Sequence, residues 1–177
     1  MACNGANASI KNLMPGDFVF GNSELKLKTL LGSCVAITLW HPDKKIGGMC
    51  HYMLPGRNLV RVDRLDGRYA NEAMLLFLQN IYKFGTDPRE YHAQLFGGSN
   101  VIVGLGDNCA TKRVFIDKLC SGCKNIACHN LYVARTAMKK YQFNVVAGDF
   151  GGTAGRKVEF DIATGRVESV KIPTLKQ

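Results

Sequence analysis

The chain lacks any hydrophobic run close to the length of a membrane-spanning helix. Crossing a bilayer takes about 20 predominantly apolar residues in succession, and no such stretch occurs among the 177 residues. The first residues, MACNGANASIKNL, also lack the basic start and long apolar stretch of a signal peptide. Ala2 stands where N-myristoylation requires glycine. We therefore expect a soluble, cytoplasmic protein.

Internal repeats and low-complexity tracts are missing as well. Apolar residues make up 46% of the chain and charged residues 21%, which is ordinary for a globular domain and excludes a disordered or collagen-like chain. A chain of this length buries its own core without disulfides or metals. The sequence predicts one domain spanning residues 1–177.

The net charge of +9 comes without a dense basic patch. Lys and Arg number 23 against 14 Asp and Glu, a balance that favours an acidic partner such as a nucleic acid, a membrane surface or an acidic protein. The basic residues are scattered, however, and no nucleic-acid-binding motif or interleaved aromatic–basic strand pattern is present. We therefore expect no nucleic-acid partner, and a solvated basic surface remains an alternative.

Alternating apolar and polar residues predict more strand than helix, hence an α+β fold. Residues 1–16 and 56–68 are polar and are expected to form turns and loops. A second helix is expected to begin at Asn130 as its N-cap residue. The predicted strands cover 25–31, 35–40, 45–54, 92–96, 143–147, 157–162 and 166–172, and the predicted helices cover 70–84 and 130–141.

Seven cysteines, an odd number, argue against a closed disulfide framework in a chain with no export signal. Cys120 and Cys123 have the spacing of a zinc knuckle, and Cys109 with Cys128 or His129 would complete a tetrahedral site. A strong zinc signal needs two such pairs, and only one is present. Incidental or buried thiols are the alternative, and no metal is expected.

Two predicted strands bring a thiol close to an imidazole. If the turn between them is His41–Lys44, Trp40 faces Lys45 and Cys34 lies directly opposite His51. Directly opposed side chains share a face of the sheet, with Cβ atoms roughly 4.5–5.5 Å apart. A slip of one residue would place the two side chains on opposite faces.

Such a pair has a chemical use. A neighbouring imidazole helps form the nucleophilic thiolate of Cys34, and the protonated His51 can then protonate a leaving group. Gly32 and Ser33 permit a tight turn whose backbone N–H groups could hold an oxyanion. The hydroxyl of Thr29 could orient the imidazole or the substrate. The alternative is a small buried cysteine and a structural histidine.

The segments LGSCVAITLW and GGMCHYMLP, followed by YANEAM, LFGGS and DFGGTAGRKVEFDIATGRV, resemble the CheD family of chemotaxis proteins. The resemblance covers about residues 25–172. It is interrupted once, by an apparent insertion at about 100–125 that brings in Cys109, Cys120 and Cys123.

The resemblance implies a β-sandwich-like core of mixed sheets flanked by helices, similar to bacterial toxin deamidases. It also implies an enzyme that converts glutamines of chemoreceptors to glutamate and releases ammonia without a cofactor. Cys34 would be the nucleophile, His51 the histidine and Thr29 the third active-site residue. The phosphatase CheC is an implied partner. The alternative is a non-catalytic adaptor that binds CheC or receptors.

The chain departs from the family pattern at two places. Cys50 stands where the family often has Asn, and because neighbouring strand residues point to opposite faces, we expect it off the active-site face. Residues 126–130, IACHN, stand where the family usually has I-G-x-R-N, which puts contacts of that arginine in doubt.

The glycine-rich segment DFGGTAGRK does not match a Walker motif. We expect Gly151, Gly152 and Gly155, together with Arg156, to shape a turn that borders either the active site or a partner surface.

Overall fold

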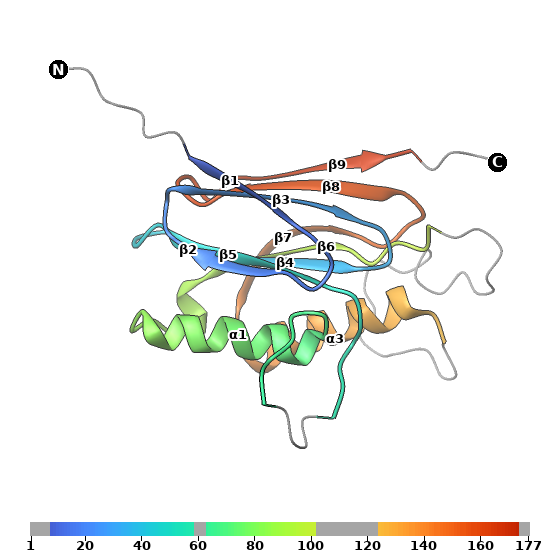
Figure 1. Cartoon of the computed structure of the whole chain (residues 1–177), viewed down its shortest axis with the longest axis horizontal. Coiled ribbons are helices and arrows are strands. Elements are labelled where there is room, and N and C mark those ends of the chain that lie inside the picture. Colours follow the sequence, from blue (N-terminus) through green and yellow to red (C-terminus); the bar gives the residue numbers. More distant parts are fainter. Residues whose placement is uncertain (1–7, 59–62, 102–123, 174–177) are drawn as a thin grey trace.

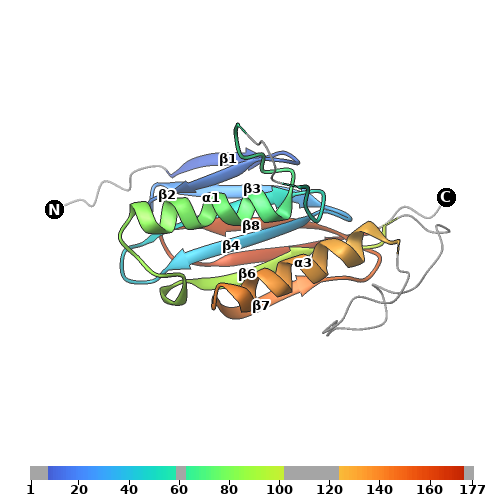
Figure 2. The same cartoon turned by 90° about the horizontal axis from the view of Figure 1, so that it is seen from below.

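The computed structural model describes residues 8–58, 63–101 and 124–173. Within these residues the molecule has three layers: a four-stranded sheet, a five-stranded sheet stacked on it, and two helices on the far side of the five-stranded sheet (Figures 1 and 2). The elements in chain order are β1 (Ser9–Leu13), β2 (Phe18–Gly21), β3 (Leu25–Leu31), β4 (Val35–His41), β5 (Ile46–Tyr52), α1 (Ala70–Lys83), the short 3₁₀ helix η1 (Pro88–Glu90), β6 (His92–Gly97), α3 (Ile126–Lys140), β7 (Asn144–Phe150), β8 (Gly155–Asp161) and β9 (Val167–Ile172).

Both sheets are mixed. The four-stranded sheet has the order β1-β3-β8-β9 and the five-stranded sheet the order β2-β5-β4-β6-β7. The β1–β3 and β6–β7 pairs are parallel, and the other pairs are antiparallel. The expectation of a β-sandwich-like α+β fold with flanking helices is confirmed.

Two apolar cores separate the three layers. One lies between the sheets and is built on side chains such as Leu27, Met49 and Phe160, and the other lies between the five-stranded sheet and the helices. Strands β4 and β5 contribute to both cores, which is why nearly all of their residues are buried. The segment VAITLW is therefore apolar on both faces, as expected of a central strand.

Helix α1 follows from its apolar spacing. Its buried residues recur at intervals of three and four, which places them on one face of a helix. The helix ends at Lys83, and Gly85 adopts a left-handed conformation with φ of 63° just beyond it, as expected of a C-terminal glycine. The buried apolar residues of this face are Ala70, Ala73, Met74, Phe77, Leu78 and Ile81.

The second helix begins earlier than expected. The prediction of Asn130 as N-cap is wrong, because the side chain of Asn125 caps α3 by accepting from the N–H groups of Ala127 and Cys128. Asn130 is a fully buried residue inside the helix. The basic residues Lys139 and Lys140 do lie in the last turn, where the helix dipole favours positive charge.

The N-terminal segment also differs from expectation. Residues 9–13 and 18–21 are strands, because β1 pairs with β3 and β2 pairs with β5 at the edges of the two sheets. Most residues of these edge strands are not fully buried, so their apolar pattern is weak. Strand formation here depends on the neighbouring strands more than on local sequence.

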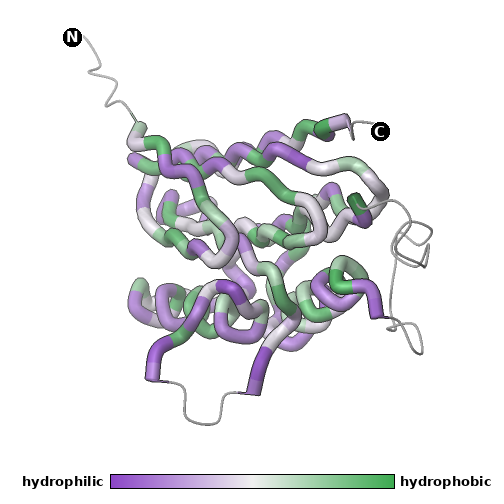
Figure 3. Tube along the Cα trace, turned by 45° about the vertical axis from the view of Figure 1, so that its right-hand side comes forward, coloured by the Kyte–Doolittle hydropathy of each residue, from purple (hydrophilic) through white to green (hydrophobic). Residues whose placement is uncertain are grey.

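The chain between β5 and α1 is largely hydrophilic on either side of residues 59–62 (Figure 3), in agreement with the predicted loop. The proposed insertion at 100–125 lies almost wholly outside the described residues. No helix in the described part of the chain is both long and apolar enough to cross a membrane.

We predict that Phe77→Ala lowers the free energy of unfolding by about 3–5 kcal/mol, because the ring is fully buried and packs edge-on against Phe18 with ring centroids 4.9 Å apart. Tyr82→Ala, on the exposed side of the same helix, should change it by no more than about 0.5 kcal/mol. Urea unfolding followed by circular dichroism measures both. Equal losses in the two variants would contradict this assignment of the core.

Candidate functional site

A hydrogen bond between Thr29 and His51 joins the two sheets. Thr29 lies on β3 and His51 on β5, and Thr29 Oγ1 is 2.8 Å from His51 Nδ1. The same hydroxyl donates to the carbonyl of Leu13 at 2.8 Å. Because a threonine hydroxyl has one hydrogen, and that hydrogen goes to Leu13, the oxygen must accept from Nδ1–H of the imidazole. His51 therefore carries its proton on Nδ1.

The other imidazole nitrogen is left ready to accept a proton. His51 Nε2 is buried and has no hydrogen-bond partner among the described residues. Burial lowers the pKa of His51 below its ordinary value of 6.5, an effect that the Leu13 backbone and the charge of Asp17 only partly offset. The imidazole is thus neutral near pH 7, with the free lone pair of Nε2 in the position of a general base.

The predicted register of the β4–β5 hairpin is wrong by two residues. Val35 pairs with Tyr52 and Ala36 with His51, so Cys34 is not directly opposite His51. The last pair before the turn is His41 with Ile46, and the turn is Pro42–Lys45.

The reason for the shift is the side chain of His41. It is buried against the ring of Tyr91, with centroids 5.2 Å apart, so His41 belongs to the strand and not to the turn. Lys45 then closes the turn in a left-handed conformation with φ of 50°, and its N–H donates to the His41 carbonyl.

The shift of two residues preserves the face on which the pair lies. Cys34 is two residues before Ala36, the partner of His51, and is therefore its diagonal neighbour on the same face. Cys34 also packs against the core between the sheets. Diagonal neighbours are about 7–8 Å apart, so a modest movement is needed to bring the thiol to the imidazole.

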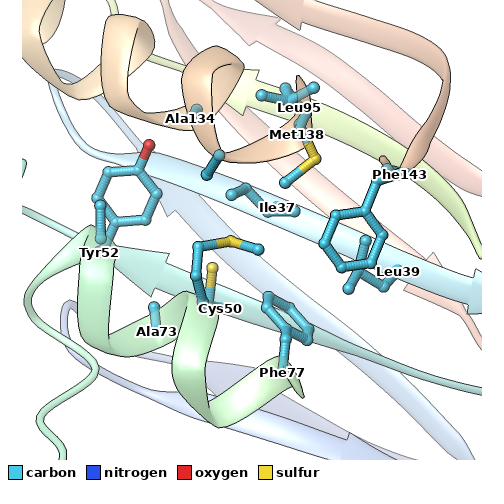
Figure 4. Close-up of a cluster of buried hydrophobic side chains, with 14 of the residues drawn as sticks. Ile37, Leu39, Cys50, Tyr52, Ala73, Phe77, Leu95, Ala134, Met138 and Phe143 are labelled. Atoms are coloured by element: carbon cyan, nitrogen blue, oxygen red, sulfur yellow. The ribbon is translucent and has the colours of Figure 1, made fainter. Parts of the chain in front are cut away.

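Cys50 lies on the opposite face, as expected. Its side chain points into the core beneath the helices, near Ala73 and Phe77 (Figure 4). Complete burial raises the pKa of this thiol to about 12. Cys50 is therefore a structural residue with no access to His51.

Cys34 is half-buried, in contrast to Cys50. Burial raises the pKa of its thiol above the ordinary value of 9.0, and the backbone amide of Cys34 offsets this only in part. The thiol is thus protonated near pH 7 in the free protein, and a base is required to make it nucleophilic.

All three carbonyls of the loop before β4 are held by other parts of the chain. The N–H of Ser99 donates to Gly32 at 2.8 Å, the side-chain amide of Asn130 donates to Ser33 at 3.2 Å, and the N–H of Gly98 donates to Cys34 at 2.7 Å. The loop Gly32–Cys34 is therefore anchored to both the turn after β6 and helix α3. We call it the nucleophile loop after the role that the family resemblance implies for Cys34.

Arg156 lies in the interior, with 2% of its surface exposed. Its guanidinium donates to Ser99 Oγ and forms an ion pair with Asp149 at 2.8 Å. Sequence reasoning did not identify Ser99, Asp149 or the position of Asn130 as part of this site. Ser99 is the last residue of LFGGS, and Asp149 is the first residue of DFGGTAGRK, so both lie within motifs that the sequence had already singled out.

The glycine-rich loop around Gly151 and Gly152 is joined to the nucleophile loop by the turn after β6. This turn, at Gly97–Asn100, lies between them and bonds to both. Gly151 donates to the Gly97 carbonyl at 2.8 Å, and Gly152 accepts from the N–H of Asn100 at 2.8 Å. Gly151 and Gly152 have φ values of 73° and 71°, which favour glycine. Gly155 lies in β8 opposite Ile172.

An apolar pocket of about 370 Å³ reaches His51 from the surface on the side of Thr29. Leu13, Met14 and Leu30 supply much of its wall, and Cys34 does not line it. The remaining lining residues are Asn12, Pro15, Lys28 and Lys157. The pocket therefore gives access to the imidazole from the side of Thr29.

The candidate metal ligands are mostly outside the described residues. Cys109, Cys120 and Cys123 fall within 102–123, and Cys128 is buried in α3. Within 8–58, 63–101 and 124–173, no three His, Cys, Asp or Glu side chains are grouped to hold a metal ion.

Comparison with known proteins identifies the relatives of this chain. Three relatives align over 155 residues, or 88% of this chain, and all are named probable chemoreceptor glutamine deamidases of the CheD type. They come from Chromobacterium violaceum (40% identical, 74% of its length), Dechloromonas aromatica (43%, 83%) and Pseudomonas fluorescens (41%, 80%). A solved structure, Bacillus licheniformis hypothetical protein YfiH, has a TM-score of 0.29 at 13% identity over 54% of this chain and 38% of that chain, too low to support any argument.

A family model described as CheD chemotactic sensory transduction matches residues 53–171, about two thirds of the chain. That match begins just after His51 and so does not include the Cys34–His51 pair, whose arrangement comes from the structure. The family model covers more than half of the chain, and the relatives are at least 40% identical over most of it. The chain therefore belongs to the CheD family.

Proposed function

We propose that this protein is a glutamine deamidase of chemoreceptors that uses Cys34 as nucleophile and His51 as general base. The observation that carries the mechanism is the Thr29–His51 hydrogen bond, because it leaves Nε2 unprotonated on the face that Cys34 shares. The substrate class comes from the relatives, which are named chemoreceptor glutamine deamidases. A CheC-type phosphatase is a further proposed partner, on the family resemblance alone.

The reaction begins when His51 Nε2 takes the proton of the Cys34 thiol and the sulfur attacks the carboxamide carbon of a receptor glutamine. Backbone N–H groups of Gly32–Cys34 stabilise the oxyanion. The imidazolium then protonates the departing ammonia. Water, deprotonated by His51, hydrolyses the thioester and releases glutamate and the free thiol. Each of these steps uses only groups of this chain, the substrate and water.

Replacement of either member of the pair should abolish turnover while the fold is retained. We expect Cys34→Ala to reduce ammonia release from a receptor cytoplasmic fragment to background, and His51→Ala to reduce it by about 10²–10⁴-fold. The matched control is Cys50→Ala, which removes the adjacent thiol on the other face and should retain activity. Mass spectrometry of the fragment identifies each glutamine converted to glutamate.

Two outcomes would contradict the mechanism. Retained activity in Cys34→Ala would exclude this thiol as the nucleophile. Loss of activity in folded Cys50→Ala would place the reactive thiol on the opposite face of the sheet, toward the helices. A wild-type protein that binds the fragment without any change in glutamine mass would instead indicate the adaptor function.

Thr29 should be needed for its hydroxyl and not for its shape. Thr29→Val keeps the side-chain volume but removes the acceptor for His51 Nδ1–H, and we expect kcat to fall by about tenfold or more. Thr29→Ser keeps the hydroxyl and should recover most of the activity. If the valine and serine variants are equally active, the hydroxyl does not orient the imidazole.

The pH profile should reflect the lowered pKa of His51. Because neutral His51 is the base, kcat/KM should fall as pH drops through that pKa, giving an acid limb with its midpoint below pH 6.5. The raised pKa of Cys34 keeps the thiol protonated across neutral pH, so activity should be flat between the acid limb and alkaline pH. A midpoint above pH 7 would contradict a desolvated imidazole as the base.

A further inference from the structure

Asn130 binds the nucleophile loop and the end of the histidine strand with a single amide group. Its Nδ2 donates to the Ser33 carbonyl at 3.2 Å and to the Met53 carbonyl at 2.8 Å. Ser33 directly precedes Cys34, and Met53 is two residues after His51. Because both carbonyls bind one nitrogen, the two segments are held close together by one side chain.

The β4–β5 ladder does not hold Cys34 in place. Its last pair on this side is Val35 with Tyr52, and Cys34 lies one residue beyond it. On the side of β6, the N–H of Gly98 fixes the Cys34 carbonyl. On the side of β5, the bonds of Asn130 are what connect the loop to the strand that carries His51.

Asn130 is itself rigidly placed. It is fully buried in α3, and its backbone carbonyl accepts a 2.8 Å hydrogen bond from the Tyr52 hydroxyl. Both amide hydrogens are used by the two carbonyls, whereas Oδ1 has no partner among the described residues. A buried amide oxygen without a partner costs stability, so a residue selected for stability alone is not expected to be asparagine.

We infer that Asn130 is a positioning residue for the proposed reaction, which sets the distance between the Cys34 thiol and the His51 imidazole through its two hydrogen bonds. The inference rests on the proposed function for the pairing of thiol and imidazole. Asn130 acts through the nucleophile loop and the end of β5 and does not contact the substrate.

The first test measures labelling of Cys34 by iodoacetamide at neutral pH, with peptide mass spectrometry to separate Cys34 from the other cysteines. Asn130→Asp keeps the size of the side chain but directs an oxygen at both carbonyls. We expect it to slow Cys34 labelling by at least about tenfold, to near the rate of His51→Ala, because the imidazole no longer assists the thiol. The Tyr52 hydroxyl near Cys34 has a pKa well above 10 and stays neutral in this experiment.

The direction of the change separates positioning from a general loosening of the fold. A loosened loop would expose the half-buried thiol and accelerate labelling. The matched control is Asn125→Ala, which removes the N-cap of the same helix without touching either loop, and should leave the labelling rate close to that of the wild type. If Asn130→Asp does not fold, Asn130→Ala serves as the test variant, because it removes both N–H groups of the side-chain amide.

With a receptor fragment as substrate, Asn130→Asp should lower kcat at least about tenfold with KM nearly unchanged, since binding contacts are intact. Unchanged or faster labelling in folded Asn130→Asp, or equal slowing in Asn125→Ala, would overturn the inference. Unchanged labelling in His51→Ala would overturn the thiol–imidazole pairing as well. Slow labelling in Asn130→Asp with no deamidation by the wild type would support the positioning role while contradicting the proposed function.

Discussion

The hydrogen bond between Thr29 and His51 is the constraint on which the site depends. It crosses the interior from one sheet to the other, so the stacking of the sheets determines where the imidazole lies. The bond also has a fixed direction, because the Thr29 hydrogen is already donated to Leu13. A packing arrangement of two sheets thereby sets a chemical property, the nitrogen on which His51 carries its proton.

The nucleophile loop is held by polar contacts where the strand ladder ends. The glycine pair Gly97–Gly98 lies so close to neighbouring atoms that a side chain would not fit. A Cβ on Gly97 would lie 2.3 Å from the Cys34 carbonyl oxygen, and one on Gly98 would lie 2.4 Å from the side chain of Leu131. Asn130 from α3 and Arg156 from β8 complete the anchoring, the latter through Ser99. Buried polar groups need partners, so these side chains and this loop are stable only together. The loop is consequently fixed by three elements that are distant from it in sequence: β6, α3 and β8.

The central strands and α1 were predictable from sequence because apolar spacing there reflects burial. The edge strands β1 and β2 were not, since they are only partly buried and owe their strand conformation to their neighbours. The shared face of Cys34 and His51 was predictable, but their register was not, because burial of His41 against Tyr91 moves the turn. The anchoring by Asn130 depends on the packing of α3 against two loops, which no local pattern reveals.

The directions of the two pKa shifts describe the resting state from which the proposed reaction would start. Burial makes the His51 imidazole harder to protonate and the Cys34 thiol harder to deprotonate, so transfer of the proton between them is uphill in the free protein. The resting pair is therefore neutral, in contrast to a preformed thiolate–imidazolium pair. In the proposed reaction, this transfer is driven by movement of the negative charge onto a carboxamide oxygen held by backbone N–H groups. In the proposed mechanism, the half-buried thiol of Cys34 reacts only as fast as His51 removes its proton, so its reactivity depends on the imidazole held beside it.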